Sequence, residues 1–181
     1  MSQKARVKAR NDDNGLRVLL VDDHDLFRTG LRNLLEEQGV QIVGEAANGQ
    51  DAIRCVREVA PDVVVMDLNM PGMSGVDATR EITSFAPLTR VVVLTISDQD
   101  EDVMDAIVAG ACGYLVKDSS IQELIRGITS AAVGESLISP HIASKVLQRI
   151  RAASVDEGGA VARTELSDRE TEVLRLIANG K

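Results

Sequence analysis

The chain has 181 residues, a formal net charge of −8, 44% hydrophobic residues and 27% charged residues. Its length suits one well-packed domain with a smaller appendage, and the acidic balance argues against a chain that is mainly a basic DNA-binding module. Phe27, Phe85 and Tyr114 are the only aromatic residues, too few for a stacking platform that binds single-stranded nucleic acid.

Residues 1–15 show no hydrophobic periodicity, and we predict a mobile leader there. The leader is basic, but no apolar stretch follows it, so it does not have the pattern of a secretory signal. The sequence also has no apolar run long enough to span a bilayer. We therefore expect a cytoplasmic protein that does not insert into a membrane.

From residue 16 onward, short apolar runs alternate with amphipathic stretches. The predicted strands are residues 18–21, 40–43, 63–66, 91–94 and 114–116. The predicted helices are residues 24–38, 49–59, 75–85, 100–110 and 120–132, the last opening with the capping-box spacing of Ser120 and Glu123. In the first helix, an apolar face is expected from Leu26, Phe27, Leu31, Leu34 and Leu35.

Five strands that alternate with helices need crossover connections, so the sheet should be parallel. Strands that are apolar throughout fit a sheet covered by helices on both faces. The fold class is therefore α/β, with a flavodoxin-like doubly wound five-stranded parallel sheet over residues 16–132. In such a sheet the ligand lies beyond the carboxyl ends of the strands.

After the sheet, Ser139 and Pro140 mark the start of a helix near residues 140–151. Residues 152–165 contain small and charged residues and complete a linker over residues 133–165. Residues 166–181 form a last amphipathic helix, which Ser167 and Glu170 open in capping-box spacing.

Polar residues follow four of the predicted strands at their carboxyl ends. Asp22 and Asp23 follow the first strand, Asp67 the third, Thr95 the fourth and Lys117 the fifth. Three carboxylates gathered at this edge favour Mg²⁺, which takes oxygen ligands and keeps some waters for a phosphate partner. The backbone carbonyl of Asn69, in the turn before Pro71, is a further candidate ligand.

This set of groups is suited to phosphoryl transfer onto a carboxylate. Asp67 can act as a nucleophile and become an aspartyl-phosphate. Lys117 offers a compact positive charge, and the Thr95 hydroxyl a hydrogen bond, to the phosphoryl oxygens. Cys55 and Cys112 are interpreted as buried reduced thiols, because neither belongs to a metal-ligand pattern.

Four blocks of sequence strongly resemble two-component response regulators. The blocks are Leu19-Leu20-Val21-Asp22-Asp23-His24, residues 63–75 around Asp67, Val93-Leu94-Thr95 and Gly113-Tyr114-Leu115-Val116-Lys117-Asp118. The resemblance implies phosphorylation of Asp67, an acidic pair in which Asp23 is the direct Mg²⁺ ligand, and Thr95 with Tyr114 as a switch pair. His24 is expected to begin the first helix and His141 to lie on a helix surface.

Residues 166–181 resemble the opening helix of the LuxR-type helix-turn-helix in NarL/FixJ-type regulators. Lys117 followed by Asp118, rather than by proline, suits the same subfamily. The chain stops at Lys181, before the helix that would read the major groove. The resemblance therefore implies a truncated DNA-binding domain, with DNA binding expected of the complete protein and not of this chain.

The predicted function is a response regulator that accepts a phosphoryl group on Asp67 from a sensor histidine kinase and, when complete, controls transcription. We expect homodimerisation on phosphorylation and no multiple-turnover enzyme activity. Two alternatives stay open: a Mg²⁺-dependent phosphohydrolase with Asp67 as nucleophile, and a receiver that acts only through protein contacts. Asn69 counts against the first, because such hydrolases often carry an acid at that position.

Overall fold

The computed structural model describes residues 15–96, 100–138, 142–144 and 146–148. It divides into two compact units, Met1–Ser139 and Pro140–Lys181. In the second unit, residues 142–144 and 146–148 are helical, within the helix predicted near 140–151. Most of the predicted leader, all of residues 152–165 and the predicted helix at 166–181 lie outside the described residues.

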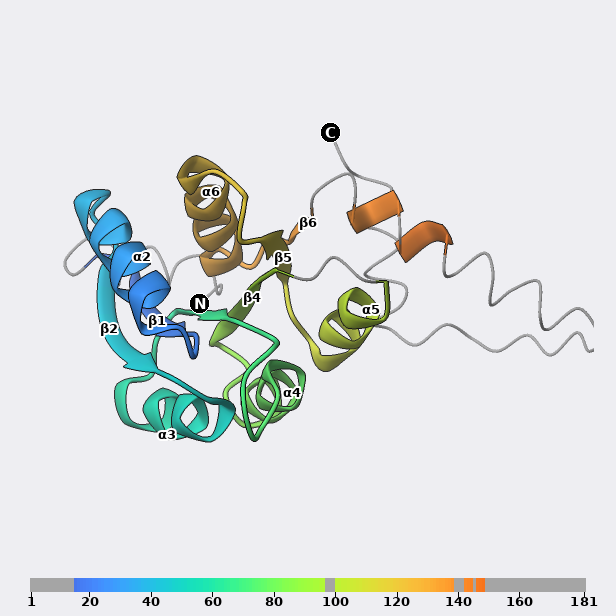
Figure 1. Ribbon diagram of the computed structural model, residues 1–181, viewed down its shortest axis with the longest axis horizontal. Helices are drawn as coiled ribbons and strands as arrows, with labels where there is room; N and C mark the ends of the chain where they lie inside the picture. The colour runs from blue at the N-terminus through green and yellow to red at the C-terminus, as the bar shows by residue number, and fades with distance from the viewer. Residues whose placement is uncertain (1–14, 97–99, 139–141, 145, 149–181) are drawn as a thin grey trace, which may run out of the picture. The chain divides into compact units, whose positions relative to one another are not determined.

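The first unit contains one parallel sheet with the strand order β2-β1-β3-β4-β5-β6 (Figure 1). The strands are β1 (Arg17–Val21), β2 (Gln41–Ala46), β3 (Val63–Met66), β4 (Arg90–Thr95), β5 (Gly113–Val116) and β6 (Leu137–Ile138). The helices are α2 (Asp25–Glu37), α3 (Gly49–Val59), α4 (Gly75–Phe85), α5 (Asp100–Ala109) and α6 (Ile121–Ala132). The predicted α/β fold is confirmed, and a sixth strand extends the expected sheet.

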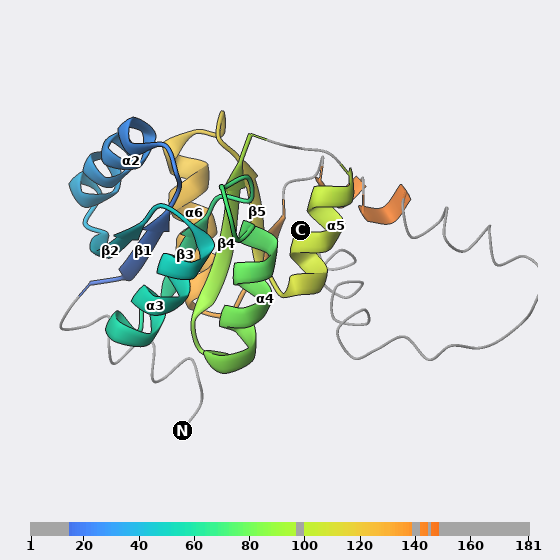
Figure 2. The same ribbon diagram turned by 60° about the horizontal axis from the view of Figure 1, so that its bottom comes forward.

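Helices cover both faces of the sheet. In Figures 1 and 2, α2 and α6 lie on one face, whereas α3 and α4 lie on the other, with α5 beside α4. The Thr83 hydroxyl of α4 donates a hydrogen bond of 2.8 Å to the carbonyl of Ala109 at the end of α5. Every residue of β3 is buried, as expected for a strand between two helical layers.

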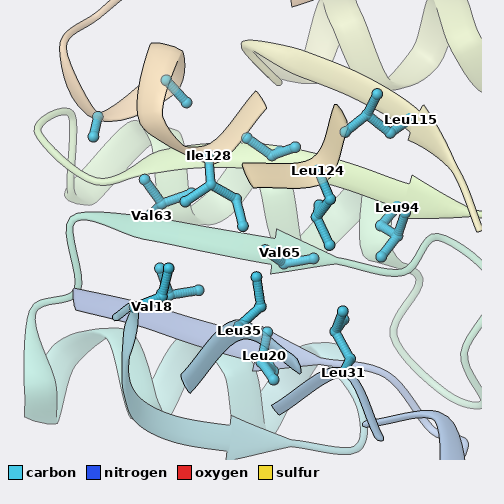
Figure 3. Packing of buried hydrophobic residues seen from close by; sticks show 14 residues of the cluster. Val18, Leu20, Leu31, Leu35, Val63, Val65, Leu94, Leu115, Leu124 and Ile128 are labelled. Carbon is cyan, nitrogen blue, oxygen red and sulfur yellow. The ribbon is translucent and has the colours of Figure 1, made fainter. Parts of the chain in front are cut away.

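Alternate strand residues supply two separate hydrophobic cores, because successive side chains point to opposite faces of a sheet. Val18 and Leu20 of β1 pack with Leu35 of α2 and Ile128 of α6 in one core (Figure 3). The other core lies between the sheet and helices α3 and α4. It contains the strand residues that point to the opposite face, including Leu19 of β1. Aliphatic side chains thus build both cores, as the scarcity of aromatic residues requires.

Local signals account for where the helices begin and end. Asn48, Ser74 and Ser120 cap α3, α4 and α6, each accepting a hydrogen bond from the backbone N–H three residues later. The capping box predicted for Ser120 and Glu123 is present. His24 precedes α2 as its N-cap residue, in agreement with the expectation that it begins this helix. Its side chain makes no capping hydrogen bond.

Two details of the prediction are corrected. The apolar face of α2 is narrower than expected, because Leu26 is 88% exposed and Leu34 is 48% exposed while Leu31 and Leu35 are buried. At 3.6 residues per turn, Leu26 lies about 140–180° around the helix from Leu31 and Leu35, so it points away from the buried stripe. The second strand also ends at Ala46 rather than at residue 43, since its pairing with β1 continues past Gly44.

Candidate functional site

The carboxyl edge of the sheet brings together side chains that are distant in the sequence. Asp22 follows β1, Asp67 follows β3, Thr95 ends β4 and Lys117 follows β5. These four strands are consecutive neighbours in the sheet and are all parallel, so their carboxyl ends meet at one edge. Asp22, Asp67 and Thr95 are buried, although each is polar. Such burial requires partners, because an unpaired buried charge is costly.

Lys117 provides the partner for two of the carboxylates. Its ammonium Nζ lies 2.6 Å from Asp22 Oδ2 and 2.7 Å from Asp67 Oδ2. The same nitrogen lies 4.7 Å from the centre of the Phe27 ring, within the range of a cation–π contact. One cation therefore joins the acidic residues that follow β1 and β3.

The pKa of Lys117 reflects two opposing effects. Burial is the largest single effect and would lower the pKa of this ammonium, but the hydrogen bonds to Asp22 and Asp67 and the negative charges of these carboxylates together outweigh it and leave the pKa above its ordinary value. The ammonium is therefore charged throughout the physiological pH range. Its stabilising contribution is complete below the pKa of an unfolded lysine and is lost only as the pH rises through the folded value.

Asp23 stands apart from this ion pair. Within the described part of the chain, its Oδ1 is the one buried side-chain oxygen or nitrogen that lacks a hydrogen-bond partner. His24 Nδ1 lies 3.0 Å from this oxygen, but the contact lacks hydrogen-bond geometry. A buried carboxylate oxygen that accepts no hydrogen bond is well suited to bind a cation.

The donor set around Asp23 fits a divalent cation. Ligand atoms from Asp22, Asp23, His24 and Asp67 all lie within 4.8 Å of one another. Three of the four residues are carboxylates, which are the oxygen ligands that Mg²⁺ prefers. The fit thus rests on both the chemistry of the donors and the unsatisfied oxygen of Asp23.

In the turn after β3, Asn69 links Asp67 to Thr95. The Asn69 N–H donates to Asp67 Oδ1 at 3.3 Å, and the Asn69 side-chain amide donates to the Thr95 hydroxyl at 3.4 Å. Thr95 is fully buried, and Tyr114, on the neighbouring strand β5, is 1% exposed. The structure therefore brings Asn69 and Thr95 beside Asp67, and it encloses the Tyr114 ring within the fold.

Gly75 allows α4 to approach the turn closely. A Cβ atom at this position would lie 2.0 Å from the backbone oxygen of Asp67, far inside van der Waals contact. The Gly75 N–H instead donates a hydrogen bond of 3.0 Å to the carbonyl of Leu68. Glycine is thus required where the helix meets the residue that follows β3.

Sequence reasoning missed two residues of α2 that contact the site. Phe27 lies against Lys117, and the Arg28 guanidinium donates a hydrogen bond to the backbone carbonyl of Asp22. The sequence pattern places Phe27 on the apolar face of the helix and indicates no role for Arg28. Their proximity to the acidic pair, one helical turn away, was the only available signal.

Comparisons with known proteins agree with this geometry. The family model described as the response regulator receiver domain matches residues 18–129. The chain is 40% identical to the transcriptional regulatory protein LiaR of Bacillus subtilis over 167 residues, which cover 92% of this chain and 78% of LiaR. It is 35% identical to the nitrate/nitrite response regulator protein NarL of Escherichia coli, over 90% of this chain and 75% of NarL.

Solved structures show the same similarity. A two-component response regulator of the LuxR family from Aurantimonas matches with a TM-score of 0.71 and 37% identity, over 76% of this chain and 99% of that one. The signal receiver domain of a NarL from Mycobacterium tuberculosis matches with a TM-score of 0.64 and 35% identity, over 67% of this chain and 98% of that one.

Proposed function

Since the chain belongs to the two-component response regulators of the NarL/FixJ type, we propose that Asp67 is its phosphoacceptor. The observation that carries the proposal is the burial of Asp67 at the carboxyl edge, with Lys117 Nζ 2.7 Å from its Oδ2. A buried carboxylate beside a fixed cation can accept negative charge that would otherwise be repelled.

The proposed reaction transfers a phosphoryl group from a phosphohistidine to Asp67. An Asp67 carboxylate oxygen forms a bond to phosphorus while the bond from phosphorus to the donor nitrogen breaks, and the departing imidazole keeps that electron pair and takes up a proton. We propose that Lys117 and the Thr95 hydroxyl contact the transferred oxygens. The distance of 2.7 Å from Lys117 Nζ to Asp67 Oδ2, and the hydrogen bonds of Asn69 to both Asp67 and Thr95, support these roles. The donor is a sensor histidine kinase, as membership of the family suggests.

We propose that Asp22, Asp23, Asp67 and the backbone carbonyl of Asn69 hold Mg²⁺, with Asp23 as a direct ligand. The orphaned Asp23 oxygen and the clustering of the carboxylates support this set. When bound, the cation supplies positive charge that offsets the charge of the phosphoryl oxygens. Lys117 then needs to neutralise less of the carboxylate charge and is free to contact the phosphoryl group.

Thr95 and Tyr114 are proposed to transmit the phosphorylated state. They lie on the adjacent strands β4 and β5, where Thr95 pairs in register with Val116 and Tyr114 with Val93. A hydroxyl that moves toward a phosphoryl group would change the space next to the buried ring. We propose that this shifts a pre-existing equilibrium and favours a homodimer.

The name of one relative, the transcriptional regulatory protein LiaR, supports transcription regulation as the output of this signal. We propose that residues 16–132 form the receiver, that residues 133–165 link it to the next domain, and that residues 166–181 begin a LuxR-type helix-turn-helix. The start of this linker also supplies the edge strand β6 to the receiver sheet. DNA is then the partner of the complete protein. In the described residues, no helix is both long and apolar enough to cross a membrane.

The test is phosphorylation by a small donor. The chain is incubated with Mg²⁺ and acetyl phosphate, and its intact mass is recorded beside Asp67→Asn, which keeps the shape of the side chain. We expect the gain of one phosphoryl group by the native chain, with no gain in the variant or after addition of EDTA. Phosphorylation of Asp67→Asn at the native level would refute the assignment.

The same sample separates an acceptor from a phosphohydrolase. A receiver keeps the transferred phosphoryl group on Asp67, so release of the alcohol from a small phosphomonoester should stop after about one equivalent per chain. Sustained release over many equivalents, abolished in Asp67→Asn, would instead support hydrolase activity.

Size-exclusion chromatography of the phosphorylated chain tests the proposed dimer.

A further inference from the structure

Arg28 lies in α2 with its side chain only 13% exposed, although its guanidinium is charged. Its Nε donates a hydrogen bond of 2.9 Å to Glu45 Oε2 on β2, and its Nη1 donates one of 2.5 Å to the backbone carbonyl of Asp22. Its Nη2 pairs with the Asp25 carboxylate. Arginine holds several acceptors in one fixed plane, so these contacts fix the guanidinium and its partners relative to each other.

The contact with Asp22 determines the orientation of a peptide plane next to the acidic pair. The carbonyl of Asp22 and the N–H of Asp23 belong to the same planar peptide unit, so fixing one fixes the other. Rotation of this plane would swing Asp23 and its orphaned Oδ1. The backbone of Asp22 is also held on its N-terminal side, because the Asp22 N–H donates a hydrogen bond of 3.0 Å to the carbonyl of Ala46 in β2.

Glu45 holds Arg28 in place from the sheet. One oxygen of Glu45 accepts from Arg28, and the other accepts from Arg32 Nη1 at 2.6 Å, one helical turn further along α2. Arg28 also lines a small cavity, about 10 Å³ in volume, whose wall includes Asp22 and Asp67. The guanidinium therefore lies next to the acidic cluster. It contacts the backbone carbonyl of Asp22 rather than the carboxylate oxygens of the cluster.

We propose that Arg28 is a positioning residue for the cation site: by holding the Asp22 carbonyl, with Glu45 as its anchor, it orients Asp23 toward Mg²⁺. The proposal rests on the proposed function, because it assumes that the acidic cluster binds this cation. Arg28 itself touches neither the cation nor the phosphoryl group. Its removal should weaken Mg²⁺ affinity and leave the phosphorylation rate at saturating Mg²⁺ nearly unchanged.

Arg32 offers a matched control in the same helix. Arg28→Met and Arg32→Met each remove one guanidinium and one contact with Glu45, but only Arg28 contacts Asp22. Isothermal titration calorimetry with MgCl₂ on the full chain measures the affinity. We expect about a 10-fold weaker Mg²⁺ affinity for Arg28→Met, the size of effect seen when an outer-shell partner of a metal site is removed, and the native affinity for Arg32→Met.

Phosphorylation by acetyl phosphate supplies a second readout. The Arg28→Met variant should need more Mg²⁺ to reach half its maximal rate, and its rate at saturation should approach that of the native chain. Equal Mg²⁺ affinities for Arg28→Met and Arg32→Met would overturn the proposal. A native chain that binds no Mg²⁺ would instead refute the proposed function, which is a separate result.

Melting curves without Mg²⁺ show whether each variant is folded. If Arg28→Met shows no cooperative transition, Arg28→Lys decides the question, because lysine keeps the charge but cannot hold Glu45 and the Asp22 carbonyl in one fixed plane. Weaker Mg²⁺ affinity in Arg28→Lys supports the positioning role, whereas native affinity in that variant refutes it.

Discussion

Lys117 is the residue whose removal should most change the balance of charge in the site. Its ammonium lies between Asp22 and Asp67, and both carboxylates are buried. Without Mg²⁺, we expect Lys117→Met to be less stable by about 3 kcal/mol, because removal of one partner leaves buried charges uncompensated. Urea unfolding with and without Mg²⁺ measures the effect.

Mg²⁺ should restore much of the lost stability, because the cation takes over the compensation of the carboxylates. Phosphorylation should remain strongly impaired, since Lys117 is proposed to contact the phosphoryl group. A Lys117→Met chain that is as stable as the native chain in EDTA would show that the ion pair contributes nothing to the fold.

Gly75 supports a prediction about shape alone. A methyl group there would collide with the backbone of Asp67, so Gly75→Ala must move either α4 or the turn. We expect a loss of about 1–3 kcal/mol in the free energy of unfolding, typical of overpacking, together with slower phosphorylation of Asp67. Thermal melts and intact-mass time courses measure the two effects.

Gly30 provides the control for this substitution. It lies exposed in the middle of α2, and a Cβ atom there would meet nothing within 4 Å. Gly30→Ala should therefore be more stable by about 1 kcal/mol, from helix propensity. If both substitutions had the same effect, the close approach at Gly75 would not matter.

At the scale of the element, the start of α6 should make stability depend on acidic pH. The backbone N–H of Ser120 and then its hydroxyl hold the pKa of Glu123 below its ordinary value. A lowered pKa contributes stability that is complete above the ordinary value of about 4.3 and is lost as the pH falls through the folded value.

Glu123→Gln removes this titration from the helix start. Urea midpoints of the two chains should therefore differ most at neutral pH and converge as the pH falls below about 4, where the native carboxyl becomes protonated. A difference that stays constant down to pH 3 would mean that the capping carboxylate does not couple to folding.

The elements also show where sequence patterns are sufficient and where they fail. The bounds of α3, α4 and β3 coincide with the predictions, because caps and continuous apolar runs define them locally. β6 was missed because Leu137–Ile138 is too short to show periodicity, and it exists as a strand only through its pairing with Gly113 and Tyr114 of β5. Strand ends and edges are thus decided by tertiary partners.

At the scale of the whole molecule, part of the site could likewise be predicted from the sequence, whereas part depends on tertiary packing. The carboxyl edge could be predicted because parallel strands must end together, which brings Asp22, Asp67 and Lys117 into one place. The contacts of Phe27 and Arg28 could not, because they depend on how α2 is rotated against the sheet. Helical periodicity gives the direction of a face, but it does not give the partner of each side chain.

Since every strand among the described residues, and every proposed site residue, lies in the compact unit Met1–Ser139, this unit should act alone. We expect a fragment of residues 1–139 to unfold cooperatively and to be phosphorylated on Asp67 at the rate of the whole chain, because a domain with its own hydrophobic cores folds independently. Circular dichroism melts and intact-mass time courses compare the two chains. A fragment that folds but is phosphorylated more slowly would show that residues after Ser139 act on the site, and an Asp67→Asn fragment controls for modification elsewhere.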